Sequence, residues 1–215
     1  MNEDASALAS TTELFATLLA RNGPPPRWRR PATFATLIRF ILEQQVSLAS
    51  AQAAFAKLDA AIGEPAPAPF LDLDDPQLRE IGFSRQKAGY VRGIADLILA
   101  DELDLDWVVG SGDEGSAALL RIRGIGPWTV ACFDLFVSGR RDVWPTGDRA
   151  LYVSLSRNLG CEGVMSKQAC DEMAAHWSPY RSTAAMMLWH DYLGGSGYEL
   201  EPGAGFLDDT GMVSE

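Results

Sequence analysis

The sequence is poor in residues that bind metals and has no segment suited to crossing a membrane. Its two histidines, His176 and His190, are far apart, and its three cysteines form no Cys-x-x-Cys pair. Because structural zinc sites need closely spaced ligands, we expect no metal and no other cofactor. The odd, scattered cysteines favour a reducing compartment over a disulfide framework. No apolar run approaches the roughly 18 residues of a membrane span, and the acidic N-terminus does not resemble a signal peptide. We therefore expect a cytoplasmic protein.

Positive charge is also scarce. Lysine and arginine number 18 against 29 aspartates and glutamates, which gives a net charge of −11. Taken alone, this balance argues against a nucleic-acid partner, because phosphates favour basic proteins. The charge is uneven, however. Residues 94–118 contain no basic side chain, whereas residues 79–92 carry four against Glu80 alone, and residues 121–149 carry five arginines. This distribution is compatible with a basic face on an acidic body.

The alternating pattern and turn chemistry of β-hairpins are absent. Apolar residues instead recur every three or four positions, which is typical of amphipathic helices. Ser47, Ser84 and Ser166 stand where N-caps belong, and Gly23 and Gly82 stand where helices end. The sequence therefore predicts an all-α fold of about ten helices, in one domain or in two lobes that share a core.

Several stretches are expected to lie outside the main helices. Residues 63–70 are predicted to be a proline- and alanine-rich connector, and residues 108–116 a loop. The last helix is expected to start at Ser178–Pro179 and to end near Tyr192. Residues 193–215 are expected to form a loosely ordered tail.

The stretch LLRIRGIGPWTVACF, residues 119–133, contains two apolar helical segments that are separated by Gly124–Ile125–Gly126. Glycine permits positive φ or close backbone approach, and Pro127 fits the first position of a following helix. The N–H groups at such a helix start suit an anion, so this turn could hold a DNA phosphate. A corner between two core helices fits the same residues.

An aspartate follows this stretch at a distance of twenty residues from Trp128. Asp148 stands in VWPTGDRALYVSL, just before a predicted helix. An ordinary N-cap is one interpretation, since its carboxylate would accept backbone N–H groups. A catalytic carboxylate is compatible with the same position.

The glycine turn and the spaced aspartate together resemble the helix–hairpin–helix DNA glycosylase superfamily. LIRFILEQQVSLASAQAAFAKL and LREIGFSRQKAGYVRGIADLI are similar to its early helices, and WSPYRSTAAMMLWHDYL to the closing helix of its bacterial 3-methyladenine DNA glycosylase II (AlkA-like) branch. The similarity covers about residues 31 to 193. It implies two helical lobes around a cleft, one from residues 31–138 and one from residues 1–30 plus 139–215. Because only about 30 residues precede the match, the N-terminal α+β domain of larger members is expected to be absent.

The resemblance implies a monofunctional DNA glycosylase of base excision repair. Such an enzyme flips an alkylated base, for example 3-methyladenine or 7-methylguanine, out of double-stranded DNA and hydrolyses its glycosidic bond, leaving an abasic site. Asp148 matches the catalytic aspartate, which would stabilise an oxocarbenium-like state. An alkylated base already carries positive charge and leaves readily. We further expect a monomer near the nucleoid and no membrane partner.

Other site residues follow from the resemblance, each with a structural alternative. Aromatic or amide side chains expected in the base pocket, or else in the core or on a helix surface, are Trp128, Trp189, Trp144 and Gln44. Residues expected to contact DNA are Gln45, Arg123, Gly124, Ile125, Gly126 and Arg149. The alternatives are a helix cap for Gln45, a corner between core helices for the glycine turn, and a pairing with neighbouring acids for Arg149. For Arg181 we prefer an ion pair with a neighbouring acid.

Three features of the sequence depart from relatives within the superfamily. Trp128 stands where bifunctional members have a nucleophilic lysine, so no Schiff base and no strand cleavage are expected. Cys161 and Cys170 cannot supply the four cysteines of the iron–sulfur members. Cys132 replaces a pocket tyrosine, which leaves the substrate range open. The same scaffold acting on uracil or mismatched bases, or a non-catalytic DNA-binding protein, therefore stay alternatives.

Overall fold

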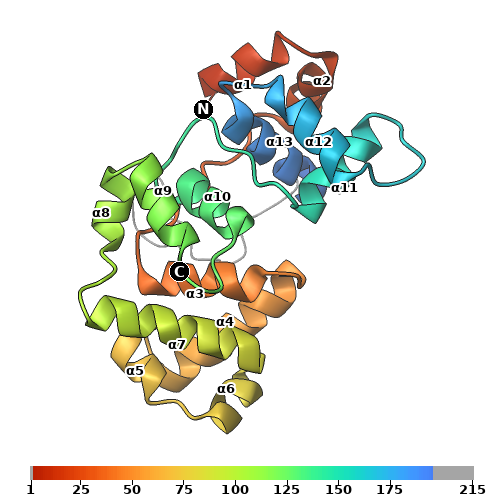
Figure 1. The fold of residues 1–215 in the computed structure, drawn as a ribbon. Helices are drawn as coiled ribbons and strands as arrows, with labels where there is room; N and C mark the ends of the chain where they lie inside the picture. The colour runs from red at the N-terminus through yellow and green to blue at the C-terminus, as the bar shows by residue number, and fades with distance from the viewer. Residues whose placement is uncertain (1, 196–215) are drawn as a thin grey trace. The chain divides into compact units, whose positions relative to one another are not determined.

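The computed structural model describes residues 2–195, and within them all regular secondary structure is helical (Figure 1). The all-α prediction is confirmed. Thirteen helices are present in this part of the chain, more than the ten expected, and they are α1 (Asn2–Ala9), α2 (Glu13–Asn22), α3 (Phe34–Glu43), α4 (Leu48–Ile62), α5 (Pro67–Leu71), α6 (Asp75–Ile81), α7 (Arg85–Leu99), α8 (Leu105–Gly110), α9 (Asp113–Leu120), α10 (Pro127–Phe136), α11 (Arg149–Asn158), α12 (Lys167–Ala175) and α13 (Arg181–Leu193). None of these helices has the length and apolar character needed to span a membrane.

The chain divides into two compact units. Residues 2–28 and 131–195 form the first unit, which contains α1, α2 and α11–α13. Residues 29–130 form the second unit, which contains α3–α9. The lobes expected from the family resemblance, 31–138 and 1–30 plus 139–215, stay a prediction.

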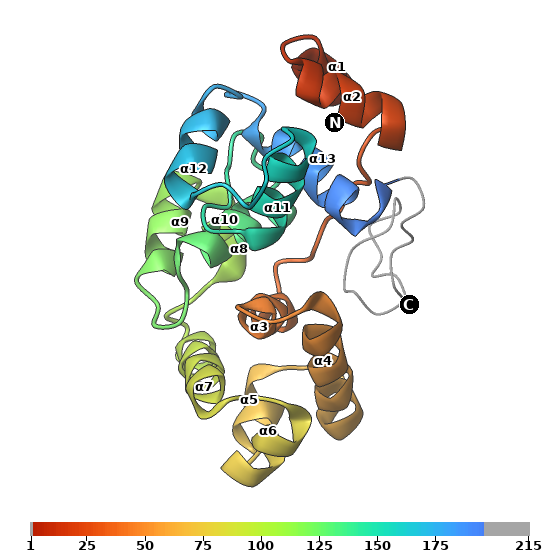
Figure 2. The ribbon, with the colours of Figure 1, turned by 90° about the vertical axis from the view of Figure 1, so that its right-hand side faces the viewer.

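Helix α13 is the centre of the first unit. It packs against α1, α2, α11 and α12, and its residues from Ser182 to Asp191 are buried. Figure 2 shows α11, α12 and α13 grouped together, with α1 beside α2. A helix that is covered on all sides needs partners for its polar groups. Two residues of α13, Trp189 and Asp191, connect this helix to α11 through their polar groups.

Asp191 holds the elements of the first unit together. Five side chains on α2 and α11 donate hydrogen bonds to its carboxylate: Arg21, Asn22, Ser154, Arg157 and Asn158. Burial raises the pKa of Asp191, but these hydrogen bonds outweigh burial and hold the pKa well below its usual range. A buried carboxylate with this many donors stays charged without being left unpaired.

The second unit packs α3 against α4 and α7, α5 against α7, and α6 against α4 and α7. Its core contains an aromatic cluster in which Phe70 meets Phe34 and Phe83 edge to face, with ring centroids 5.9 and 5.5 Å apart. Such pairs add about 0.5–1.5 kcal/mol beyond the area that they bury. This core fixes α3 and α7, which carry residues of the candidate site.

Most predicted helix ends are confirmed. The hydroxyls of Ser47, Ser84 and Ser166 accept backbone N–H groups three residues further on, as N-caps do. Gly23 and Gly82 end α2 and α6, both with positive φ. These signals are local, which is why the sequence alone locates them.

Short helices account for most of the errors. The predicted connector 63–70 ends in α5, which starts at Pro67, and the predicted loop 108–116 is mostly α8 and α9. Helix α1 was not predicted, and the last helix starts at Arg181, with Tyr180 as its N-cap, instead of at Ser178–Pro179. The predicted tail lies almost entirely outside the described residues. Helices of five to eight residues carry too few apolar repeats for their periodicity to be recognised.

Candidate active site

The glycine turn connects α9 to α10 in the second unit. Gly124 has a φ of +96°, and a Cβ atom placed there would lie 2.3 Å from the ring of Tyr90. Only glycine fits such a position. Gly126 has open space around it and an ordinary φ, so the need for glycine is confined to the first of the two. Pro127 is the first residue of α10, as predicted.

The backbone of this turn offers hydrogen-bond donors. Ile125 is 4% exposed, and its N–H donates to the carbonyl of Ile122, so its side chain anchors the turn in the core. Within residues 2–195, the N–H groups of Gly124 and Gly126 donate to no protein acceptor. They lie at the positive end of α10, and this arrangement suits an anion.

The turn between α3 and α4 is tied to the glycine turn. Gln44 ends α3, and its Nε2 atom donates to the carbonyl of Gly124 at 2.9 Å and to Oγ1 of Thr129 at 3.0 Å. In the described structure Gln44 therefore braces the hairpin from α3. Gln45 follows with a φ of +58° and an exposed side chain.

Lys87 on α7 supports the same turn from the other side. Its ammonium donates to the carbonyls of Leu42 and Gln44, at 2.8 and 2.9 Å. Burial lowers the pKa of Lys87. A cation at the C-terminal end of a helix stabilises that end through the helix dipole, so Lys87 stabilises the end of α3 and the backbone that leads into Gln45.

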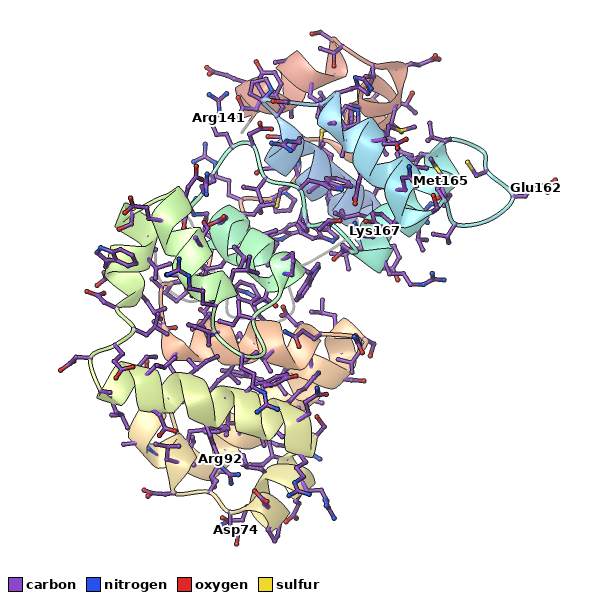
Figure 3. The ribbon with its side chains drawn as sticks, in the orientation of Figure 1. Asp74, Arg92, Arg141, Glu162, Met165 and Lys167 are labelled. Carbon is purple, nitrogen blue, oxygen red and sulfur yellow. The ribbon has the colours of Figure 1, made fainter. Side chains whose placement is uncertain are left out.

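A basic hollow of about 530 Å³ lies beside the glycine turn. It is lined by Arg85, Gln86, Gly89, Tyr90 and Arg123, and no acidic residue is among these. The guanidinium of Arg123 lies over the ring of Tyr90, 5.8 Å from its centroid. One arginine from each basic stretch seen in the sequence, Arg85 and Arg123, thus lines this hollow, whereas Arg92 on α7, labelled in Figure 3, is paired with Asp75.

Asp148 begins α11 in the first unit. Its Oδ1 atom accepts the N–H of Leu151 at 2.9 Å, as an N-cap does, and the indole N–H of Trp189 at 3.1 Å. Trp189 is 9% exposed, and its ring stacks on Phe136 with centroids 5.3 Å apart. The carboxylate is therefore oriented by two donors from different helices. Both interpretations of its position, cap and candidate catalytic group, remain compatible.

Trp189 and Trp144, two of the predicted pocket aromatics, both use their indole N–H groups within the protein. Trp189 donates to Asp148, and Trp144 donates to Asp171 on α12 at 2.9 Å. Trp144 also meets Trp177 edge to face at 5.4 Å. Trp128 is half-buried at the second position of α10 in the other unit.

The structure also places the remaining basic residues. Arg149 is exposed at the first position of α11. Arg181 donates to the carboxylate of Asp142 through Nε at 2.7 Å, so the predicted ion pair is confirmed. The hydrogen bond from Arg181 lowers the pKa of Asp142 to about 2.

Two polar residues near Asp148 were missed in the sequence. Asp171 accepts hydrogen bonds from the loop that precedes Asp148, and Tyr152 bonds to both that loop and Asp171. No motif marks either residue, because their partners come from other elements.

These features are those of a DNA repair glycosylase scaffold, and comparison with known proteins supports this class. Residues 38–179 match the family described as HhH-GPD superfamily base excision DNA repair protein, and the chain belongs to this family. In the described part of the chain, no group of three or more histidine, cysteine or acidic side chains could hold a metal ion.

Individual relatives make the resemblance more specific. YfjP of Bacillus subtilis is 30% identical over 167 residues, which are 74% of this chain but only 58% of YfjP. The alkylbase DNA glycosidase-like protein mag2 of Schizosaccharomyces pombe is 25% identical over 85% of this chain and 89% of its own length. The structure of 3-methyladenine DNA glycosylase Mag1 of the same yeast, in complex with abasic DNA, is similar with a TM-score of 0.73 at 22% identity, covering 92% of this chain and all of Mag1.

Proposed function

We propose that this protein is a monofunctional DNA glycosylase that removes alkylated bases, such as 3-methyladenine and 7-methylguanine, from double-stranded DNA. The observation that carries the proposal is Asp148, held at the start of α11 by Leu151 and Trp189 in a member of a base excision repair family. The names of mag2 and of Mag1 point to the same class of substrate. We further propose that the protein acts as a monomer associated with the bacterial nucleoid.

The chemistry follows from where charge develops. When the glycosidic bond breaks, the base leaves with the bonding electrons and the deoxyribose becomes positively charged. A carboxylate fixed beside the sugar stabilises that charge without having to reorient, and it can orient the water that attacks C1′. An alkylated base is cationic before the bond breaks, so it needs no acid to leave. Trp128 and Trp144 stay candidates for stacking on the cationic base, worth about 0.5–2 kcal/mol each.

The DNA backbone is proposed to bind at the glycine turn. The N–H groups of Gly124 and Gly126 would hold one phosphate, with Arg123 and Arg85 of the basic hollow adding charge. Arg149 is proposed to contact a further phosphate. Because few phosphates are neutralised by a protein of net charge −11, binding is expected to be modest and to weaken steeply with salt.

The exposed Gln45 is proposed to enter the space that the flipped nucleotide leaves. Its left-handed backbone turns the side chain out at the tip of the α3–α4 connection, and the contacts of Gln44 and Lys87 fix that tip. An amide can hydrogen-bond to the base left without a partner. The alternative role, an amide that caps the end of α3, would not require Gln45 to contact DNA.

The product is proposed to be an intact strand with an abasic site. A glycosylase that also cuts the strand needs an amine for a Schiff base, and Trp128 occupies the position where such members of the superfamily have a lysine. Purified protein should therefore release bases from methylated duplex DNA and leave nicks only after alkali treatment. Nicking without alkali would contradict this part of the proposal.

Replacement of Asp148 by Asn tests the central claim. The amide can still accept the N–H groups of Leu151 and Trp189, so the fold and DNA binding should persist while base release falls by at least about 100-fold. Asp4→Asn is the matched control, because Asp4 pairs with Arg141 on the surface of the same unit. Equal turnover by Asp148→Asn and wild type would remove the proposed mechanism.

A substrate panel separates the alternatives. Wild-type protein is offered duplexes that contain 3-methyladenine, 7-methylguanine, uracil or a mismatch, and base release is measured for each. Release of the two cationic bases alone is expected. Release of uracil alone would assign the scaffold to neutral bases, and binding without any release would favour a non-catalytic DNA-binding role.

A further inference from the structure

The loop that leads into Asp148 is held by an aspartate from another helix. Asp171 lies on α12, and its carboxylate accepts the indole N–H of Trp144 at 2.9 Å and the hydroxyl of Thr146 at 2.6 Å. The next residue, Gly147, has a positive φ of +86°. Its N–H donates to the hydroxyl of Tyr152 at 2.5 Å, and that hydroxyl donates to Asp171 at 2.9 Å. Three of the four residues before Asp148 are therefore hydrogen-bonded to Asp171 or to Tyr152, which together form the Tyr152–Asp171 pair.

The pair is built to keep one geometry. Oδ1 of Asp171 accepts from Trp144 and Tyr152, and Oδ2 accepts from Thr146 and from Lys167, which is the first residue of α12 (Figure 3). Each carboxylate oxygen thus has two donors. Burial raises the pKa of Asp171, but these donors outweigh burial and lower it, so the acceptor stays ionised at neutral pH.

The packing of α11 does not by itself require the hydroxyl of Tyr152. It is buried, and its ring follows Asp148 by four residues, one helical turn further along α11. Burial raises the pKa of its hydroxyl, which keeps the proton that it donates to Asp171. The hydroxyl thereby joins the start of α11 to α12 through the backbone of Gly147.

We propose that Tyr152 and Asp171 are positioning residues for Asp148. They hold the 144–147 loop so that Asp148 begins α11 in one backbone geometry, with its carboxylate fixed beside the substrate sugar. The proposal rests on the proposed glycosylase function. A carboxylate that acts by electrostatic stabilisation must be held within a fraction of an ångström, because a displacement of about 1 Å can cost about 100-fold in rate. Two donors on Asp148 itself restrain its side chain, whereas this network restrains its backbone.

Tyr152→Phe is the sharpest variant, because it keeps the ring and removes only the hydroxyl. We expect its single-turnover rate of base release, per folded molecule, to fall about 10- to 100-fold, with affinity for abasic DNA within twofold of wild type. Asp171→Asn should behave in the same way. Tyr180→Phe is the matched control, since the Tyr180 hydroxyl makes no hydrogen bond among residues 2–195, and it should keep the wild-type rate.

A double variant distinguishes positioning from general stability. If Tyr152 acts through Asp148, then adding Tyr152→Phe to Asp148→Asn should leave the residual rate unchanged. A further 10-fold fall in the double variant, or a wild-type rate in Tyr152→Phe, would overturn the proposal. Should Asp171→Asn fail to fold, Tyr152→Phe decides alone.

Hydrogen exchange gives a reading that does not depend on catalysis. Loss of the Tyr152 hydroxyl should speed exchange of the Gly147 amide by tenfold or more, with the amides of α13 unchanged. Unchanged exchange at Gly147 would overturn the proposal even if activity fell. A wild-type protein that releases no base would refute the proposed function, and the exchange result would still show whether the loop is held as described.

Discussion

Replacement of Trp189 by Phe isolates the hydrogen bond between α13 and Asp148. Phenylalanine can still stack on Phe136, but it lacks the indole N–H that lies 3.1 Å from Oδ1 of Asp148. A hydrogen bond to a charged group is worth about 1.5–3 kcal/mol. If that restraint acts on the transition state, the single-turnover rate of base release should fall about 10- to 150-fold, while affinity for duplex DNA stays near wild type.

The same replacement elsewhere controls for packing. Trp177 is buried in the same unit and meets Phe15 and Trp144 through its ring, and Trp177→Phe leaves the hydrogen bonds of Asp148 in place. Both variants should lose about 1–2 kcal/mol of stability from the smaller ring, measured by urea unfolding. Only Trp189→Phe should lose activity per folded molecule. Equal rates in Trp189→Phe and wild type would show that the indole is a core residue and no part of the site.

Two further outcomes follow from the turns and ion pairs. Gly124→Ala should lower the free energy of unfolding by more than about 1 kcal/mol in urea and weaken DNA binding, because φ is +96° and the ring of Tyr90 fills the space of the Cβ. Gly126→Ala should have only a small effect on stability. Equal effects of the two replacements would contradict the described turn. The pKa of Asp142 is lowered from 3.8 to about 2 by the hydrogen bond from Arg181, so its contribution is present above about pH 4 and is lost as the pH falls towards 2. After allowance for solvent screening, this contribution to the free energy of unfolding is about 1 kcal/mol. Asp142→Asn should remove that part of the acid dependence of the melting temperature. An unaltered acid dependence would argue against the ion pair.

The sequence predicted the features that depend on neighbouring residues. Ser47, Ser84 and Ser166 are N-caps because a hydroxyl next to an apolar repeat satisfies the first free N–H groups. Pro127 starts α10 for the equally local reason that its missing N–H costs nothing there. The all-α class followed from the same spacing of apolar residues.

The contacts between helices that organise the site could not be predicted from local sequence patterns. Trp189 meets Asp148 across 41 positions of sequence, and Gln44 meets Gly124 across 80. No rule of spacing predicts such pairs, because they depend on how helices pack. The family resemblance named most of these residues, and the place in the base pocket that it implies for Trp189 and Gln44 stays a prediction. The hydrogen bonds by which they brace Asp148 and the glycine turn are seen only in the structure.

Tyr152 shows a further limit of pattern recognition. In the sequence it looks like one more apolar position on the buried side of α11. Its hydroxyl acquires meaning only when α12 brings Asp171 within reach. A single tyrosine in an amphipathic helix carries no signal of this kind, so only a structure could reveal the network.

The Asp191 cluster has a practical consequence for anyone who trims the gene. A fragment cut to the family match at 38–179 would discard α2 and α13 together, and with them Arg21, Asn22, Asp191 and the indole that steadies Asp148. The catalytic candidate would still be encoded, yet its scaffold would be gone. The shortest portion that retains this architecture has to reach from the second helix to the thirteenth.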